Sequence, residues 1–320
     1  MKGGPAHRVS VVIPCHNWGA NWPRLRDAIR SQTYPHYAEY ILVDNNSTDA
    51  SVSLVAPDVV KLKSEGLNVR LMHEDRIQSS YAARNTGIRS ATADIVAFTD
   101  TDCVPEPDWL EQLVHGFRDP HLLLAAGKIL AAPPTTILED FADLFGILSA
   151  RNAQEHSYLP FAQTANMAVR RVVFERIGLF RPHLQSGGDA DFCWRFLHDH
   201  PGQRISYLEK AVIRHLHRRT WRELGEQFVK YGRGHYVLHK LHGVPLPRKS
   251  PLLAHGPWLQ LATWICWSLP REVVRCLVAS RDYRRGRLIQ DFASVYCAWC
   301  FHHGVSQRVL PANFEAIERL

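Results

Sequence analysis

Long apolar runs are missing from this chain of 320 residues. No stretch reaches the roughly 18 consecutive apolar residues that a membrane-spanning helix needs. The nearest one, Trp258 to Leu269, is followed at once by Pro270 and Arg271, so we expect no membrane span. The first residues also lack the basic head and apolar stretch of a secretion signal, and we therefore expect a cytoplasmic protein.

Cysteine is too scattered to form a disulfide framework. The seven cysteines are an odd number spread along the chain, which fits a reducing compartment. A recognisable nucleic-acid-binding module is missing as well, although the formal net charge of +7 suits anionic partners such as phosphorylated substrates or anionic lipid. We therefore expect no nucleic acid among the partners.

The glycine-rich turn of dinucleotide-binding enzymes is also absent. Such enzymes carry Gly-x-Gly-x-x-Gly directly after their first strand. Here the apolar run Val9 to Ile13 is followed by Pro14-Cys15-His16-Asn17. This difference excludes a nicotinamide-dependent dehydrogenase.

What is present is an alternation of short apolar runs with helical patterns. Strands are predicted at 9–13, 40–43, 69–72, 95–98, 122–129 and 166–169. Helices are predicted at 23–32, 81–92, from 107, from Asp189 as the cap to about 198, and at 220–231. Continuous apolar strands separated by helices predict an α/β fold with a mostly parallel sheet, covered by helices on both faces. Ligands bind such sheets at the carboxyl ends of the strands.

A proline-rich segment at 243–251 predicts a domain boundary. We expect a catalytic domain over 1–242 and a helical C-terminal extension over 243–320. The extension is rich in tryptophan and arginine, which suits the surface of an anionic membrane. The same composition suits a helical hairpin packed on the catalytic domain or on another subunit. We favour peripheral contact with the inner face of the membrane.

Charged side chains follow the predicted strands. Asp100 and Asp102 stand two residues apart after the strand 95–98. Hard divalent cations such as Mg²⁺ or Mn²⁺ prefer oxygen ligands and often bridge to substrate phosphates, but a solvated turn would also suit this pair. Asp44 can likewise bind a ligand or only stabilise the turn that follows the strand 40–43. Arg84 can clamp a diphosphate or form a surface ion pair.

Six stretches, in family order, resemble the family 2 glycosyltransferases of the GT-A fold. They are Val9 to Asn17, Ile41 to Asp49, Ala82 to Gly87, Ala97 to Asp102, Ala165 to Arg170 and Gly188 to Arg195. The resemblance implies an inverting transfer of sugar from a nucleoside diphosphate sugar to a hydroxyl of a glycan, lipid-linked or small-molecule acceptor. It also implies a divalent cation, Mg²⁺ or Mn²⁺. The alternative is a non-catalytic nucleotide-sugar-binding protein that keeps the fold.

The resemblance implies roles for single residues on the donor side. The residues implied to bind the nucleotide sugar are Pro14, Asn17, Asp44, Asn46, Arg84 and Asp100. Among them, Asp44 would bind the base and Asp100 would face the ribose or the metal. Asp102 would coordinate the metal directly.

On the acceptor side, Asp189 matches the aspartate of the Glu-Asp pair that serves as general base in the family. Gly188 stands where many relatives carry glutamate, which leaves Asp191 as a second candidate for the base. Asp191 can instead be an early-helix acid that complements the helix dipole. Trp194 and Arg195, in the same stretch, are expected near the acceptor.

A basic segment at 212–219 adds a histidine candidate. In the family a histidine near this place can complete the metal site, so His215 is a candidate metal ligand. His217 is the alternative, since alternate residues of a strand share one face. A solvated basic segment is the other interpretation.

Overall fold

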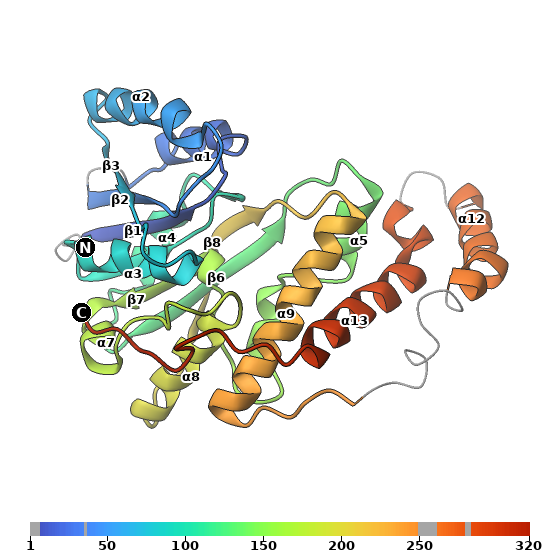
Figure 1. Ribbon diagram of the computed structural model, residues 1–320. Helices are drawn as coiled ribbons and strands as arrows, with labels where there is room; N and C mark the ends of the chain where they lie inside the picture. Colours follow the sequence, from blue (N-terminus) through green and yellow to red (C-terminus); the bar gives the residue numbers. More distant parts are fainter. Residues whose placement is uncertain (1–6, 35–36, 249–260, 279–282) are drawn as a thin grey trace. The chain divides into compact units, whose positions relative to one another are not determined.

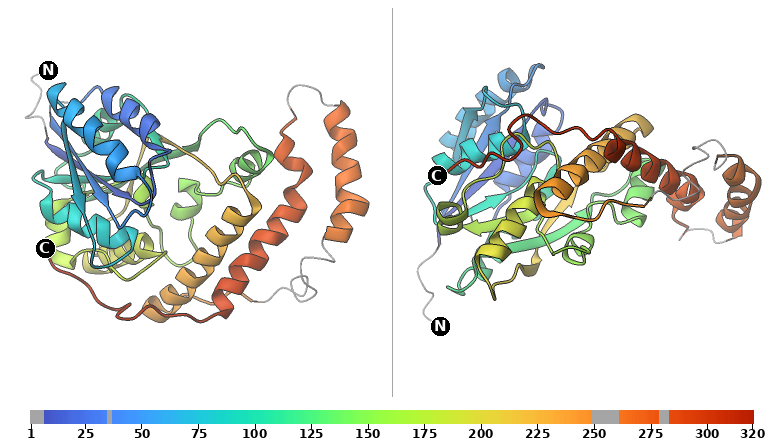
Figure 2. Two further views of the ribbon diagram at one scale, coloured as in Figure 1. Left: turned by 45° about the horizontal axis from the view of Figure 1, so that its top comes forward. Right: turned by 60° about the horizontal axis from the view of Figure 1, so that its bottom comes forward.

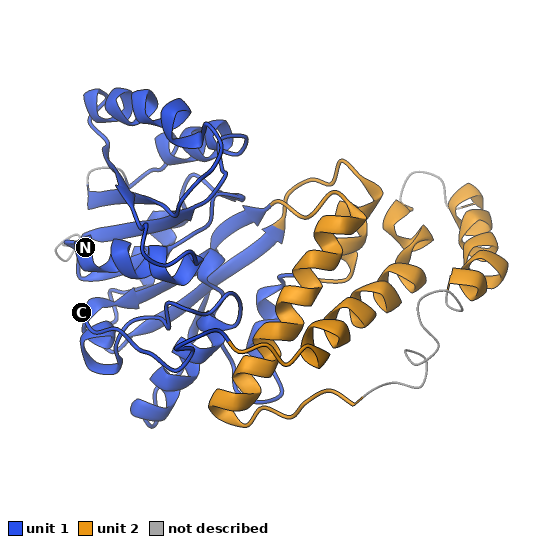
Figure 3. Cartoon of the chain, in the orientation of Figure 1, with its two compact units in different colours: residues 1–130, 148–215, 311–320 blue, residues 131–147, 216–310 orange. Residues whose placement is uncertain are grey.

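The computed structural model describes residues 7–34, 37–248, 261–278 and 283–320. The chain forms two compact units, which Figure 3 shows in different colours. Unit 1 consists of residues 1–130, 148–215 and 311–320, and unit 2 consists of residues 131–147 and 216–310. The expected boundary after residue 242 does not coincide with this division, because the helix that ends there belongs to unit 2.

The core of unit 1 is an eight-stranded sheet in the order β3-β2-β1-β4-β7-β6-β8-β5. The strands are β1 (Val9–Cys15), β2 (Ala38–Asp44), β3 (Asn68–His73), β4 (Ile95–Phe98), β5 (Cys103–Pro105), β6 (Leu124–Ala131), β7 (Met167–Arg170) and β8 (Ser206–His215). Strands β3, β2, β1 and β4 are parallel, as the sequence predicts. β7 pairs antiparallel with both β4 and β6, and β5 pairs antiparallel with β8. The second half of the sheet therefore departs from the predicted parallel order.

The parallel half of the sheet is the most deeply buried. Every residue of β1, β2 and β4 is buried, as expected for strands covered on both faces. β3 is the edge strand and is partly exposed. Helix α3 (Ser80–Ser90) packs against β1. Gly87 permits this close approach, since a Cβ at that position would collide with the side chain of Val12.

The remaining helices of unit 1 connect the strands (Figure 1). They are α1 (Trp22–Arg30), α2 (Ser51–Ser64), α4 (Trp109–Gly116), α6 (Ala150–Gln154), α7 (Arg171–Ile177) and α8 (Gly188–Asp199), with a 3-10 turn at Thr164–Asn166. Helix α2 is not among the predicted helices, and it contains Pro57, a residue that is disfavoured in helix interiors. The cap of α8 is Gly187, with a φ of 81°, so the predicted cap role of Asp189 is wrong. Asp189 lies in the first turn of the helix instead.

Unit 2 is helical. Its helices are α5 (Ile137–Leu144), α9 (Trp221–His242), α12 (Leu269–Val278) and α13 (Gln290–Ser306), with a π-helical turn at Trp264–Ser268 and a 3-10 turn at Arg285–Leu288. Helices α9 and α13 lie side by side in every view (Figures 1 and 2). A Cβ at Gly232 would collide with the carbonyl oxygen of Phe301, and one at Gly304 with that of Val229. Glycine at these two positions therefore allows the two backbones to touch.

The C-terminal part of the chain was expected to be helical, and α12 and α13 confirm this for the residues described. Trp258 and Leu259, which belong to the expected helical stretch, lie outside the described residues. None of the helices in the described ranges is long and apolar enough to span a membrane.

Candidate active site

The carboxyl ends of the parallel strands gather polar side chains from loops that are far apart in the sequence. Strands β2, β1 and β4 are neighbours, and Cys15 at the end of β1 is in register with Asp44 at the end of β2. The two following loops are tied together, since the amide of Asn17 donates to Ser47 Oγ (3.0 Å) and the amide of Thr48 donates to Asn17 Oδ1 (2.9 Å). Pro14, one of the expected binding residues, is buried within β1.

Asp44 is buried and oriented by its own turn. Its Oδ1 accepts a hydrogen bond from Ser47 Oγ (2.5 Å), and its Oδ2 lies 3.7 Å from Nδ1 of His73. Asn46, two residues later, is exposed and has a positive φ of 56°, a conformation that asparagine tolerates better than most residues. Asp44 thus lies at the base of the turn and Asn46 at its surface.

Arg84 approaches the acidic loop after β4 from helix α3. Its buried guanidinium donates from Nη2 to Asp100 Oδ1 (2.5 Å) and lies over the ring of Tyr81, 5.4 Å from the ring centroid. The helix begins at a defined point, because Ser79 Oγ accepts from the amide of Ala82 (3.0 Å). A buried arginine cation is therefore held beside a partly exposed carboxylate.

Asp189 brings a further carboxylate to this cluster from α8. It is partly exposed, and Tyr81 Oη lies 3.4 Å from its Oδ1 as hydrogen-bond donor. Although the residue is partly exposed, protein atoms surround its carboxyl, and this desolvation raises the pKa of Asp189; the nearby Arg84 charge opposes this rise and the Asp100 charge adds to it. Arg84, Asp100 and Asp189 therefore form one electrostatic cluster.

Gly188 is explained by the same neighbour. A Cβ at this position would lie 2.7 Å from the ring of Tyr81. The tyrosine ring thus fills the space in which a larger residue 188 would begin its side chain. Tyr81 therefore leaves no room for a side chain at position 188 unless its ring moves.

Asp102 lies beside His215, although the two residues are far apart in the sequence. His215 Nε2 lies 3.3 Å from Asp102 Oδ1. Cys103 is in register with His215 across the antiparallel pair of β5 and β8, and ligand atoms of Asp102, Cys103 and His215 all lie within 4.8 Å of one another. A carboxylate, a thiol and an imidazole at this spacing fit a divalent cation. His217 lies beyond the end of β8 and belongs to unit 2.

Three further expected site residues lie in the interior of unit 1. Asp191 is fully buried, with its two oxygens 3.0 Å from Nε of Arg181 and Nε of Arg195 respectively. Arg195 also donates to two backbone carbonyls, and Trp194 is fully buried with Nε1 donating to the carbonyl of Leu159 (3.0 Å). The structure therefore does not bring Asp191, Trp194 or Arg195 into the exposed acidic cluster.

Sequence reasoning missed Tyr81 and Cys103. Cys103 had a usable signal, because a thiol directly after an acidic pair adds a third donor. Tyr81 had none, since its contact with Asp189 spans 108 positions of the sequence and depends on how α3 and α8 pack.

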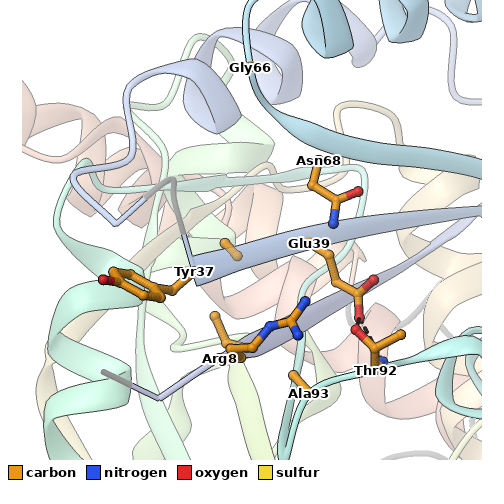
Figure 4. Close-up of a pocket in the computed structure, with 9 residues that line it drawn as sticks. Arg8, Tyr37, Glu39, Gly66, Asn68, Thr92 and Ala93 are labelled. Atoms are coloured by element: carbon orange, nitrogen blue, oxygen red, sulfur yellow. Dashed lines mark hydrogen bonds between the residues drawn. The ribbon is translucent and has the colours of Figure 1, made fainter. Parts of the chain in front are cut away.

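A hollow at the opposite end of the sheet is a different kind of site (Figure 4). It has a volume of about 130 Å³ and is lined at the amino ends of the strands by residues including Arg8, Tyr37 and Asn68. This volume is below the roughly 300–1,000 Å³ of small-molecule pockets. Its carboxylate, Glu39, accepts hydrogen bonds from Ser10 and from Thr92. These contacts indicate that Glu39 stabilises the fold at this end of the sheet.

Comparison with known proteins now decides the family. Residues 10–178 match the family model described as Glycosyl transferase family 2. Glycosyltransferase AglE of Haloferax volcanii is 32% identical over 222 residues, which cover 64% of this chain and 71% of the relative. The chain belongs to glycosyl transferase family 2. It is therefore a glycosyltransferase.

Other similarities agree with this family and with the fold. A pre-mycofactocin glycosyltransferase of Mycobacterium tuberculosis is 30% identical over 273 residues, covering 83% of this chain and 54% of that relative, so the chain spans about half of its length. The mannosyltransferase PcManGT of Pyrobaculum calidifontis, solved with GDP-Man and Mn²⁺, has a TM-score of 0.60 at 20% identity. That alignment covers 92% of this chain and 86% of the other. The GT-A fold is thus shared.

Proposed function

We propose that this family 2 glycosyltransferase moves a sugar from a nucleoside diphosphate sugar to an acceptor hydroxyl with inversion, and that Asp189 is the general base. The observation that carries the proposal is the cluster of Arg84, Asp100 and Asp189, which come from three separate elements. It combines a cation for the leaving diphosphate with a carboxylate for the acceptor proton. Structures with this fold have been solved with GDP-Man and Mn²⁺ and with UDP-GlcNAc, which supports a donor of this class.

The acceptor side follows from the chemistry of Asp189. Its carboxylate takes the proton of the acceptor hydroxyl while that oxygen forms a bond to the anomeric carbon. The bond from the anomeric carbon to the diphosphate oxygen breaks in the same step, so the configuration inverts. The pKa of Asp189 is raised by burial, which makes its carboxylate a better proton acceptor. A positioned base contributes roughly 10²- to 10⁴-fold in rate.

The donor side uses the loops after β1, β2 and β4. Pro14, Asn17, Asp44 and Asn46 would bind the nucleoside, and Arg84 would turn part of its guanidinium toward the diphosphate. Asp102 and His215 would hold a divalent cation, Mg²⁺ or Mn²⁺. When bound, such a cation neutralises charge on the leaving diphosphate.

Asp189 is favoured over Asp191 as the base. Both oxygens of Asp191 face guanidinium groups of largely buried side chains, which stabilise its charge and leave it a poor proton acceptor. On the same helix Trp194 is buried, and the side chain of Arg195 is only 12% exposed. We propose that these three residues hold α8 in place and that acceptor contacts come from other residues.

The test separates binding from transfer. Metal-depleted protein is titrated with nucleotide sugars plus Mn²⁺ by calorimetry, and sugar transfer or donor hydrolysis is then measured with the donor that binds. Asp189→Asn should bind this donor normally and lose transfer, whereas Asp102→Ala should lose metal-dependent binding. The exposed Asp27→Asn is the matched control.

Two outcomes would contradict this account. Normal sugar transfer by Asp189→Asn would show that Asp189 is not the general base. Tight donor binding by the wild type without turnover, on any acceptor or on water, would favour the alternative of a non-catalytic nucleotide-sugar-binding protein.

We further propose that unit 2 contacts an anionic membrane surface, at the inner face of the membrane in a cytoplasmic protein. The residues around α12 expose large apolar side chains that are 41–79% accessible. These are Ile265, Trp267, Val273, Val274, Leu277 and Val278. Arg271 and Arg275 are exposed on the same helix, and an apolar face beside arginine is typical of helices that lie in a lipid interface.

Vesicle co-sedimentation tests this contact. The double variant Trp267→Ala/Leu277→Ala should bind anionic vesicles several-fold more weakly, while vesicles of neutral lipid should bind either protein weakly. The control is Leu54→Ala/Val60→Ala, which removes two similarly exposed apolar side chains from α2. Equal binding by both double variants would contradict the proposal.

A further inference from the structure

The backbone positions a cysteine beside the expected metal ligands. β5 has only three residues and begins at Cys103, which lies opposite His215 on β8. Residues directly opposite on antiparallel strands have their Cβ atoms about 4.5–5.5 Å apart and on the same face. The amide of Glu106 donates to the carbonyl of Val212 (3.0 Å), which continues the pairing beyond the strand. Cys103 is therefore held where its thiol must approach the imidazole.

The donor atoms lie slightly farther apart than the ligands of a small cation, all within 4.8 Å of one another. His215 Nε2 and Asp102 Oδ1 are 3.3 Å apart, and Cys103 Sγ and Asp102 Oδ1 are 4.0 Å apart. Ligands at about 2.0–2.3 Å from a tetrahedral ion lie about 3.3–3.8 Å from one another. Small side-chain adjustments would bring all three atoms onto one ion. Cys103 and His215 are both buried, so the site lies mostly away from water.

We propose that Cys103 is a third protein ligand and that the site therefore binds thiophilic cations of the Zn²⁺ class through Asp102, Cys103 and His215. This rests on the proposed function, because it concerns the same metal site. Thiolate ligands select Zn²⁺ and related ions, whereas Mg²⁺ prefers oxygen. Binding replaces the thiol proton, which leaves to solvent, by a sulfur–metal bond. A water or a diphosphate oxygen would supply a further ligand, as in catalytic zinc sites.

The surroundings distinguish this cysteine from the others. Cys15, Cys193, Cys297 and Cys300 are also buried, and burial alone is ordinary for cysteine. Within the described ranges, the set of Asp102, Cys103 and His215 is the group of three such side chains whose donor atoms approach closely enough to hold an ion. A plain packing cysteine needs no carboxylate and no imidazole beside its sulfur.

Optical titration of the full chain with Co²⁺ and Cd²⁺ tests the proposal without any sugar donor. Metal-depleted wild type should develop one equivalent of a sulfur-to-metal charge-transfer band. Cys103→Ser should lose that band, and its affinity for Zn²⁺ should fall roughly tenfold or more, comparable to the loss of a supporting group. Cys266→Ser, which alters an exposed cysteine, should keep the band. A band that survives in Cys103→Ser, or no band in the wild type, would overturn the proposal.

Calorimetry with Mn²⁺ and donor separates this inference from the proposed function. Cys266→Ser, which lies outside the metal site, should keep Mn²⁺-dependent donor binding, and a thermal melt of Cys103→Ser close to that of the wild type checks that this variant is folded. If the wild type shows no charge-transfer band but Asp102→Ala abolishes donor binding, this inference fails while the proposed function stands. If Asp102→Ala also binds donor normally, both fail.

Discussion

The two ends of the parallel half-sheet differ in how many of their acidic residues remain partly exposed. At the amino ends, Glu39 is buried and accepts hydrogen bonds from Ser10 and Thr92, with Arg70 as its ion pair. At the carboxyl ends, Asp44 is buried too, but Asp100 and Asp102 remain partly exposed, as does Asp189 from the nearby helix α8. A buried and fully paired acid stabilises a fold, while partly exposed acids that converge from several loops are available to a ligand. The contrast shows which acids to test for function.

The same contrast recurs within one helix. Asp189 and Asp191 lie two residues apart in the first turn of α8. Asp189 faces a tyrosine hydroxyl and the partly exposed cluster, whereas Asp191 faces two largely buried arginines. Sequence position near a helix start therefore does not tell a base from a structural acid.

The largest expected effect on stability is at Asp191. Asp191→Ala leaves Arg181 and Arg195 buried without their shared carboxylate, and removing one partner of a buried pair typically costs about 3–5 kcal/mol. Urea unfolding should show a loss of this size. The control is Asp189→Asn, which should unfold close to the wild type. Equal losses of unfolding free energy in both variants would contradict the view that Asp191 is structural and Asp189 is not.

A smaller loss of stability is expected at Gly188. Gly188→Glu introduces a Cβ 2.7 Å from the ring of Tyr81, and overpacking of this kind costs about 1–3 kcal/mol. Tyr81→Ala should relieve the clash, so the double variant should be more stable than the sum of the single effects predicts. Additive losses would show that Tyr81 does not limit residue 188.

Glu39 gives a pH-dependent effect of similar or smaller size. Burial alone would raise its pKa, but hydrogen bonds from Ser10 and Thr92 lower it overall. Stability contributed by the charged form is therefore present above the ordinary glutamate pKa and is lost as the pH falls through the lowered value. The wild type should be about 1–3 kcal/mol more stable than Glu39→Gln at neutral pH, and this difference should shrink in acid. Transfer activity should not change.

The smallest effect is a shift in a pH profile. The charge of Arg84 lowers the pKa of Asp189, so Arg84→Gln should raise that pKa. The acid limb of kcat/KM for sugar transfer should then move to higher pH, in addition to any loss of donor affinity. An acid limb that stays in place would mean that another group is the base.

Sequence patterns predicted the features that local apolar runs determine. The buried strands β1, β2 and β4, and the polar turns after them, follow from continuous apolar runs with polar ends. The antiparallel direction of β7 does not, because an apolar run has the same appearance in either direction. The predicted helix 220–231 is too short, because α9 continues to His242. Gly232 looks like a helix end in the sequence, but in the structure it permits the close approach of α13.

In the candidate site, too, some residues can be predicted from their position in the sequence, while others depend on tertiary packing. Asp100, Asp102 and Asp44 could be selected from their positions after strands. The interior position of Asp191 could not, because Arg181 reaches it from the loop before α8. Nor could the contact of Tyr81 with Asp189, which requires the packing of α3 against α8.

The most direct measurement is a crystal structure of the full chain with Mn²⁺ and the nucleoside diphosphate, UDP or GDP, that binds more tightly. We predict Mn²⁺ at Asp102 and His215, the diphosphate beside Arg84, and the carboxylate of Asp189 facing the space next to the terminal phosphate. A nucleotide bound anywhere else, or Asp189 turned away from it, would contradict the account.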